Sequence, residues 1–302
     1  MNAIVIRAYG GPEELKPEER PDPVPGPGEV LVRVTATSVN PFDWKVRSGA
    51  YKDIFPLTFP AILGSDVAGT VEAVGPGVQG FASGVRVFGQ ATQTYASLCV
   101  IKAADLARIP TGIDVIETAA LPVVTTTGAQ LAELATRGRQ RGTVLVTGAV
   151  GNVGRSAVFT AKESGWSVIA GVRNKQMQEA KATGADRVIA LDDQAALKSL
   201  EPIDAIADTI SGLIADQLMG KVKNGGVFAS VLAPPSNTGA YPGVRVETMQ
   251  VKPSPATLLR MAEAVRTGKL VIPLGRRYPL SDASKAHSAA EKGDAGKLLL
   301  VA

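Results

Sequence analysis

Closely spaced small residues between positions 148 and 154 have the composition of a turn that binds phosphate groups. The segment follows an apolar run at 144–146 and precedes a helical pattern at 155–164. A pyrophosphate can bind the amides of a helix N-terminus only where the backbone comes close, and this requires small residues. A second strand pattern follows at 167–172, so the order of strand, turn, helix and strand predicts a dinucleotide site. The expected contacts are Gly148, Ala149, Gly151, Asn152, Val153 and Gly154.

The loop after the strand at 167–172 indicates which dinucleotide binds. A site for NAD carries an acidic residue about twenty positions beyond the glycine turn. Here the sequence reads Arg173-Asn174-Lys175, and no acid follows until Glu179. A guanidinium can hold the 2′-phosphate of NADPH through paired hydrogen bonds, and Lys175 adds a second charge. We therefore predict NADPH, bound by Arg173, Asn174 and Lys175; the alternative is an ordinary cationic loop.

Helix and strand patterns alternate from about position 116 onward. Helices are expected at 128–137, 155–164, 176–183 and 256–267, and strands near 144–147, 167–172, 187–190, 203–207 and 227–231. Repeated units of this kind predict a parallel sheet with right-handed connections. Because a dinucleotide binds beyond the carboxyl ends of such strands, Thr209, Ser230 and Val231 are also expected near the cofactor.

The first part of the chain is rich in strand patterns instead. Alternating residues at 28–34, 67–77 and 85–88 predict strands, and the prolines between 12 and 27 indicate an extended connector. Strand and short-helix patterns near the end are expected to return to this part. The chain is thus predicted to be α/β, with one domain at 1–117 and 276–302 and a second at 118–275.

Composition excludes several classes of protein. The 302 residues are 45% apolar and 20% charged, and no apolar run approaches membrane-spanning length. The start of the chain has no long apolar core, so no signal peptide is expected. The net charge is only +4, and the basic cluster Arg137, Arg139 and Arg141 favours a solvated loop over a nucleic-acid surface. The single cysteine, Cys99, excludes an internal disulfide, and a cytoplasmic protein is expected.

Five motifs in order resemble the zinc-free quinone oxidoreductase branch of the medium-chain dehydrogenase/reductase superfamily, the group that includes zeta-crystallin. They are residues 38–43, 47–51, 60–69, 71–75 and 148–154. The likeness continues at 277–280, 286–287 and 296–297 and covers nearly the whole chain. It implies a GroES-like β-rich catalytic domain and a Rossmann domain with a doubly wound parallel sheet that binds the nucleotide.

The resemblance also bears on metal binding. In the alcohol dehydrogenase branch, cysteine and histidine side chains hold a catalytic zinc at positions that Asn40, Ser65 and Pro122 occupy here. With one histidine and one cysteine in the chain, a metal site would need carboxylates, whereas zinc prefers nitrogen and sulfur ligands. We therefore expect no metal.

Without a metal, hydrogen-bond donors must stabilise the oxyanion that forms during hydride transfer. Tyr51 and Asn40 match family residues, and Lys45 lies between them in sequence. We expect Tyr51 to bind or polarise the acceptor carbonyl; alternatively, it is a half-buried aromatic with its hydroxyl in water. Lys45 contacts the nicotinamide ribose or is simply solvated. Thr126 matches a family threonine near the nicotinamide, but could equally be a helix cap.

Other polar residues are expected to be structural. His287 is the only histidine, yet it lies in an expected C-terminal helix, and Cys99 lies in an apolar run. Asp66 is expected to organise the loop under the active site through backbone hydrogen bonds. None of the three is expected to be catalytic.

The leading hypothesis is an oxidoreductase that passes a hydride from NADPH to a quinone or to an activated enone or alkenal double bond. The second hypothesis is a catalytically quiet NADPH-binding protein with a structural, sensing or RNA-binding role, since fold does not fix function. The trio Asn40, Lys45 and Tyr51 favours an enzyme. The alternating stretch 244–251 predicts an edge strand, and therefore a homodimer.

Overall fold

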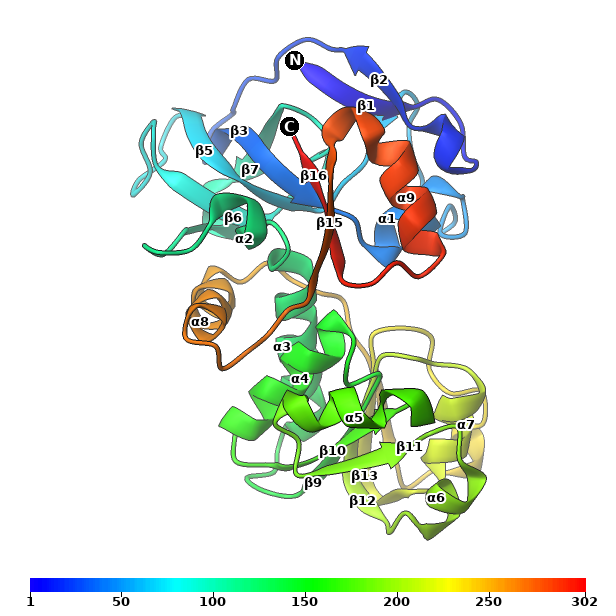
Figure 1. Cartoon of the computed structure of the whole chain (residues 1–302). Helices are drawn as coiled ribbons and strands as arrows, with labels where there is room; N and C mark the ends of the chain where they lie inside the picture. The colour runs from blue at the N-terminus through cyan, green and yellow to red at the C-terminus, as the bar shows by residue number, and fades with distance from the viewer. The chain divides into compact units, whose positions relative to one another are not determined.

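Two units, each built around its own sheet, make up the chain (Figure 1). The structure is a computed structural model that describes all residues from Met1 to Ala302. Unit 1 comprises Met1–Val123, Pro253–Arg266 and Ile272–Ala302, and unit 2 comprises Val124–Lys252 and Thr267–Val271. Contacts thus group residues 253–266 with unit 1, whereas the predicted domains divide the chain by its sequence pattern and stay a prediction.

Unit 2 contains a six-stranded parallel sheet in the order β11-β10-β9-β12-β13-β14. The chain enters at the middle of the sheet, builds outward to β11, and then returns to build the other half. This is the doubly wound α/β sheet that the sequence predicts, and the point where strand order reverses lies between β9 and β12. The strands are β9 (Thr143–Thr147), β10 (Ser167–Val172), β11 (Arg187–Ala190), β12 (Ile203–Asp208), β13 (Val222–Ser230) and β14 (Arg245–Thr248).

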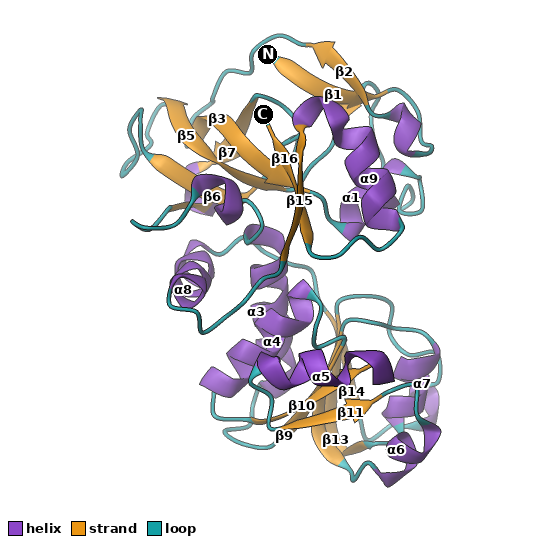
Figure 2. Cartoon of the chain, in the orientation of Figure 1, coloured by secondary structure: helices purple, strands orange, loops and turns teal.

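Both faces of this sheet are buried, which explains why its strands are continuously apolar. Val144 and Val146 of β9 pack in one apolar cluster with α3 and α4, while Leu145 packs in another with Phe228 and Leu218. Helices therefore cover the two faces (Figure 2). They are α3 (Pro122–Thr136), whose first two residues belong to unit 1, α4 (Asn152–Glu163), α5 (Met177–Ala180), α6 (Gln194–Ser199) and α7 (Leu213–Met219).

Unit 1 contains a seven-stranded sheet in the order β15-β16-β3-β5-β6-β8, with β7 also paired to β3. A smaller sheet has the order β2-β1-β4. The strands are β1 (Asn2–Ile6), β2 (Lys16–Glu19), β3 (Glu29–Ser38), β4 (Ala61–Ile62), β5 (Asp66–Val74), β6 (Arg86–Gln90), β7 (Leu98–Lys102), β8 (Leu106–Arg108), β15 (Leu274–Pro279) and β16 (Lys297–Val301). The helices are α1 (Pro41–Arg47), α2 (Val115–Thr118), α8 (Pro255–Arg266) and α9 (Ala283–Glu291).

The end of the chain returns to unit 1, as the sequence predicts. Strand β16 pairs antiparallel with β3, and Leu299 lies opposite Ser38. This register brings residue 297, at the start of β16, to the end of β3, where residues 38–40 lead into α1. The C-terminal strand is therefore part of the structure that positions the candidate active site.

Three predicted elements differ from the observed ones. The connector at 12–27 is not wholly extended, because a 3-10 turn at Pro12–Glu14 precedes β2. The helix expected at 128–137 begins already at Pro122, since proline fits the first turn of a helix. The helix expected at 176–183 is broken into 3-10 and α turns and ends at Gly184, whose φ is +82°.

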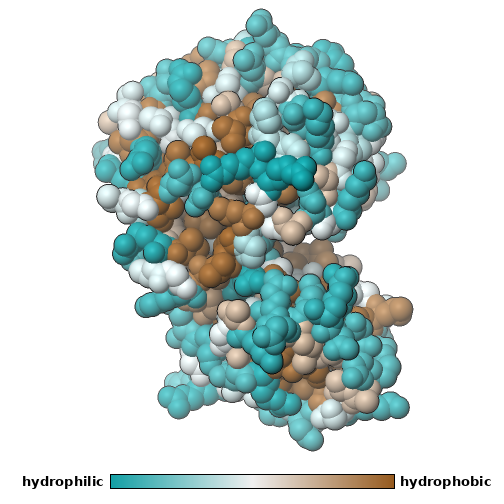
Figure 3. Space-filling model, viewed as in Figure 1, coloured by the Kyte–Doolittle hydropathy of each residue, from teal (hydrophilic) through white to brown (hydrophobic).

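Hydrophilic residues cover much of the face shown in Figure 3, with apolar residues between them. No helix of the structure combines the length and apolar composition needed to span a membrane. A few large apolar side chains are nonetheless exposed in unit 1, among them Phe42 at 38% and Phe55 at 44%.

Candidate active site

The glycine turn of unit 2 has the close-packed backbone that phosphate binding requires. A Cβ atom on Gly154 would lie 2.2 Å from the carbonyl oxygen of Gly148, and one on Gly148, whose φ is +61°, would lie 2.5 Å from Thr209 Oγ1. Helix α4 begins directly after Gly151, which has no side chain to cap it. The first amides of α4, at Asn152 and Val153, are thus available to an anion.

The loop after β10, which is predicted to bind the 2′-phosphate of NADPH, is exposed. Arg173 forms no salt bridge, and its Nε lies 3.4 Å from Gln176 Oε1. The backbone amide of Asn174 donates to Asp192 Oδ1 at 2.7 Å, which fixes the path of the loop. Lys175 is exposed beside it. Two cationic side chains are therefore exposed on a loop whose backbone is held by Asp192.

Thr209, which is partly exposed, and the buried Ser230 belong to a polar network at the ends of three neighbouring strands. Asp208 accepts from Thr147 Oγ1 at 2.7 Å and from Ser230 Oγ at 3.0 Å. The Thr209 hydroxyl donates to the carbonyl oxygen of Thr147 at 2.7 Å. The backbone amide of Val231 donates to the carbonyl oxygen of Asp208 at 3.2 Å. These contacts join β9, β12 and β13. The cofactor contacts expected of Thr209, Ser230 and Val231 stay predictions.

Thr126 is one of four residues with a buried side-chain polar atom that has no hydrogen-bond partner. It is completely buried inside α3, and its Oγ1 has no hydrogen-bond partner. Because it is the fifth residue of α3, it is not the cap of that helix. A buried hydroxyl without a partner costs free energy, which a polar group of a bound ligand would recover.

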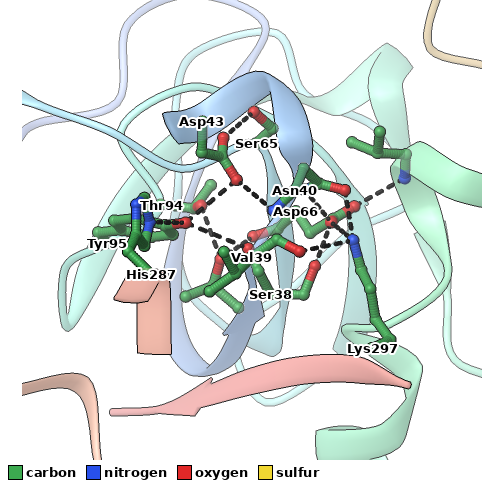
Figure 4. Close-up of polar contacts among 12 residues, drawn as sticks. Ser38, Val39, Asn40, Asp43, Ser65, Asp66, Thr94, Tyr95, His287 and Lys297 are labelled. Carbon is green, nitrogen blue, oxygen red and sulfur yellow. Dashed lines mark hydrogen bonds and ion pairs between the residues drawn. The ribbon is translucent and has the colours of Figure 1, made fainter. Parts of the chain in front are cut away.

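In unit 1, the carboxylate of Asp66 is the centre of a buried polar network (Figure 4). Its Oδ2 accepts from Ser38 Oγ and, at 2.8 Å, from Asn40 Nδ2. Its Oδ1 accepts from the backbone amide of Val123 at 2.7 Å. Asp66 is fully buried at the start of β5, so it ties the end of β3 to the first turn of α3.

Lys297 supplies the positive charge of this network. It is 3% exposed, and its Nζ lies 3.5 Å from Asp66 Oδ2. The ammonium also donates to Asn40 Oδ1 and, at 3.2 Å, to the carbonyl of Val39. Burial lowers the pKa of Lys297, and the charges of Asp66 and Asp43 oppose that effect. Sequence reasoning missed this residue; its signal was a lone lysine at the start of an apolar terminal strand.

These contacts fix the side chain of Asn40. Its Oδ1 faces the Lys297 ammonium and its Nδ2 faces the Asp66 carboxylate, so only one orientation of the amide is possible. Its backbone amide also donates to Asp43 Oδ2 at 2.8 Å, which caps α1. Asn40 is therefore positioned from both ends, with one Nδ2 hydrogen left over to donate.

A second buried carboxylate, Asp43, lies next to the first. Its Oδ1 accepts from Ser65 Oγ at 2.8 Å, and its Oδ2 accepts from the Tyr95 hydroxyl at 3.1 Å. Burial raises the pKa of Asp43 to about 6, although the hydrogen bonds from Ser65 and the Asn40 amide work in the other direction. This carboxyl group can therefore change its protonation state near neutral pH.

His287 supports Asp43 through Tyr95. The Tyr95 hydroxyl lies 3.0 Å from His287 Nε2, and Arg47 Nη1 lies 2.9 Å from Nδ1. Since arginine can only donate, Nδ1 accepts and Nε2 carries the proton. Burial and the charge of Arg47 lower the pKa of His287 to about 3. The imidazole is thus neutral and fully buried, in agreement with its predicted structural role.

The other two predicted catalytic residues contact each other. Lys45 Nζ donates to the Tyr51 hydroxyl at 3.2 Å and lies 5.3 Å from the centre of that ring. The Tyr51 ring lies 6.1 Å from Phe42 and 6.3 Å from Phe55. Phe42 and Phe55 meet edge to face at 5.0 Å. The hydrogen-bond donors Lys45 and Tyr51 thus lie beside the rings of Phe42 and Phe55. Asn40 instead belongs to the Asp66 network.

No three His, Cys, Asp or Glu side chains of the chain group as metal ligands. Ser65 and Asn40 are bonded to Asp43 and Asp66 instead. Cys99 is buried in unit 1, where burial raises the pKa of its thiol to about 12 and makes it a poor ligand and nucleophile.

Comparison with known proteins identifies the family to which the chain belongs. Residues 26–135 match the alcohol dehydrogenase GroES-like domain, and residues 183–300 match the zinc-binding dehydrogenase domain. A chloroplast envelope quinone oxidoreductase homolog of Arabidopsis thaliana is 30% identical over 99% of this chain and 98% of its own. The chain belongs to the quinone oxidoreductase family of medium-chain dehydrogenases/reductases.

Solved structures of the superfamily agree in fold. The quinone oxidoreductase of Coxiella burnetii has a TM-score of 0.87 at 27% identity, covering 100% of this chain and 99% of its own. The mycobacterial protein Rv1454c, solved in complex with NADPH, has a TM-score of 0.85 at 28% identity, with 100% of both chains covered. An NAD-dependent alcohol dehydrogenase has a TM-score of 0.84 at 30% identity, again over 100% of both chains. The predicted pairing of a GroES-like and a Rossmann domain is confirmed.

The neutral His287 predicts a pH dependence of stability. Its pKa is about 3 when folded and near 6.5 when unfolded, so acidification from pH 6.5 toward 3 favours the unfolded state, which binds the extra proton. The free energy of unfolding of the wild type should therefore fall relative to that of His287→Gln by about 1.4 kcal/mol per pH unit. Urea denaturation at pH 4.5, 5.5, 6.5 and 7.5 measures this difference.

Asp43 titrates in the opposite sense, because its raised pKa stabilises the fold below about pH 4 and that contribution is lost as pH rises through about 6. This contribution is present in both proteins and cancels in the difference. A difference that does not change with pH would show that His287 is not held neutral.

Proposed function

We propose that this chain is a zinc-independent oxidoreductase that transfers a hydride from NADPH to a quinone or to an activated enone or alkenal double bond. The observation that carries the proposal is that each unit contains one of the two groups of residues that the reaction needs. Unit 2 combines a closely packed glycine turn with the exposed cations Arg173 and Lys175. Unit 1 displays the donors Lys45 and Tyr51 beside exposed aromatic rings.

NADPH fits the residues of unit 2. The close backbone approach at Gly148 and Gly154 suits the pyrophosphate, and Arg173 with Lys175 suits the 2′-phosphate. The buried, unpartnered hydroxyl of Thr126 suits a polar group of the nicotinamide. When bound, NADPH supplies the hydride.

Unit 1 would bind the acceptor through hydrogen bonds. Because Tyr51 accepts from Lys45, its own hydroxyl proton is free to donate to a carbonyl oxygen, and the adjacent ammonium strengthens that donor. The remaining Nδ2 hydrogen of Asn40 is a second donor on a fixed side chain. This donor set supports a reaction in which negative charge develops on oxygen without a metal.

The aromatic cluster favours a quinone over a short alkenal. The rings of Phe42 and Phe55 are partly exposed and lie within 6.3 Å of Tyr51, which carries the donor hydroxyl. A flat, ring-shaped acceptor can stack on such rings, whereas an aliphatic chain gains less from them. Among the two acceptor types, a quinone therefore has the better match.

We also propose a homodimer in a reducing compartment such as the cytoplasm. Strand β14 forms one edge of the parallel sheet of unit 2, and such an edge can pair with a second copy. A nucleic-acid partner has less support, since Arg139 of the basic loop is paired with Asp204 at 3.0 Å.

A screen of NADPH oxidation at 340 nm tests the proposed function. The purified protein should oxidise NADPH with 1,4-naphthoquinone faster than with 2-cyclohexenone or short alkenals, and exhaustive chelation should leave that rate unchanged. Tight NADPH binding with no oxidation across the panel would favour the catalytically quiet alternative. Loss of activity on chelation, restored by zinc, would refute the metal-free reaction.

Cofactor choice is tested by Arg173→Glu. A carboxylate at this position repels the 2′-phosphate but can accept from ribose hydroxyls, so the Kd for NADPH should rise by about 100-fold or more while that for NADH changes little. Fluorescence titration with each cofactor measures this, with Arg187→Glu as the control for an exposed cation on the neighbouring strand. Equal losses for both cofactors would show that Arg173 does not read the 2′-phosphate.

A further inference from the structure

Reduction of a carbonyl needs a proton as well as a hydride, and Ser65 and Asp43 form a hydrogen-bonded pair that can supply one. Ser65 Oγ lies 2.8 Å from Asp43 Oδ1 (Figure 4). The serine is partly exposed, whereas the aspartate is 2% exposed. We propose that the Ser65 hydroxyl protonates the reduced acceptor and that the Asp43 carboxyl group behind it is the source of that proton. The inference rests on the proposed oxidoreductase function.

The contacts of Asp43 determine where its proton lies. Oδ2 already accepts from the Asn40 amide at 2.8 Å and from the Tyr95 hydroxyl at 3.1 Å. A proton on Oδ2 would meet these two donors, so a proton bound by the carboxyl group lies on Oδ1. From there it points at Ser65 Oγ, the only group bonded to that oxygen. The carboxyl group can therefore pass its proton in one direction.

Tyr95 is held in place so that this direction is fixed. Its hydroxyl also contacts His287 Nε2 at 3.0 Å, and His287 is bound in turn by Arg47, which is paired with Glu291 at 2.5 Å. Because arginine donates to His287 and does not release its proton, no proton passes through Arg47 from His287 to Glu291. Asp43 thus exchanges protons through Ser65 alone.

The hydride brings two electrons to the acceptor and leaves negative charge on its oxygen. That oxygen takes the proton of the Ser65 hydroxyl as Ser65 Oγ takes the proton of Asp43 Oδ1, so the serine is unchanged and Asp43 becomes a carboxylate. Water on the exposed side of Ser65 then returns one proton to Asp43 by the reverse path. In total, NADPH, acceptor and one proton give NADP⁺ and the reduced acceptor.

The charges around Asp43 leave it suited to this task. Asp66 of β5 raises its pKa and Lys297 of β16 lowers it, while burial is the largest effect and brings the pKa to about 6. Tyr95 and, behind it, the neutral His287 of α9 and Arg47 of α1 complete the surroundings. A general acid works best when its pKa lies near the working pH.

The pH dependence of turnover tests the proposal, with NADPH and 1,4-naphthoquinone as the probe. Since only the protonated carboxyl group donates, kcat of the wild type should fall by up to tenfold per pH unit above about 6. The kcat should also be lower in heavy water than in ordinary water, because a proton is transferred. Ser65→Ala should lower kcat at pH 6 by about 100-fold and abolish both dependences. Ser65→Thr, which keeps the hydroxyl, should retain them, and Asp43→Asn should give the flat profile of Ser65→Ala.

Controls separate this proposal from the alternatives. Ser48→Ala removes an exposed serine hydroxyl that bonds only to the backbone of Lys45 and Ala50, and this variant should keep the wild-type profile. If Asp43→Asn does not fold, the pair Ser65→Ala and Ser65→Thr still decides the outcome, with the free energy of unfolding as the check on folding. The proposal would be overturned if Ser65→Ala kept the pH dependence of kcat, or if only Tyr51→Phe abolished it. A wild type that reduces no acceptor would instead refute the proposed function.

Discussion

The burial of one carboxylate, that of Asp66, constrains much of unit 1. A charge taken out of water is tolerated only when donors and an opposite charge replace the lost hydration. The structure provides them from three directions: Ser38 and Asn40 at the end of β3, Val123 in the first turn of α3, and Lys297 at the start of β16. Without the C-terminal strand, the carboxylate would have no counter-ion.

This constraint explains how the polar side chains of the candidate site are held in position. The amide of Asn40 is fixed because its two ends face opposite charges, and the backbone of Asn40 in turn binds Asp43. Asp43 then orients Ser65. Each residue is therefore held by a group that is itself buried and bonded, which is the arrangement that precise chemistry requires.

The sequence predicts the parts of the molecule whose chemistry is local. The glycine turn at 148–154 and the exposed loop at 173–175 can be read from a few adjacent residues, because backbone approach and charge depend on residue type at fixed spacing. The parallel sheet of unit 2 is predicted for a similar reason, since its strands are apolar on both faces.

Contacts between distant residues could not be predicted in this way. Lys297 meets Asn40 across 257 positions, and only the register of β16 on β3 brings them together. Likewise, Tyr95 and His287 are 192 positions apart, and neither pattern nor composition links them. Asp66 was expected to bind backbone, and it does so at Val123, but its larger role as the partner of Lys297 follows from tertiary structure alone.

The most direct test of this account is a double-mutant cycle on the free energy of unfolding with Asp66→Asn and Lys297→Met. Each single variant leaves one buried charge without its partner and should lose about 3–5 kcal/mol. The double variant removes both charges and should lose clearly less than the sum of the two. Losses that add within about 0.5 kcal/mol would contradict the account, because they would show that the two side chains are held independently.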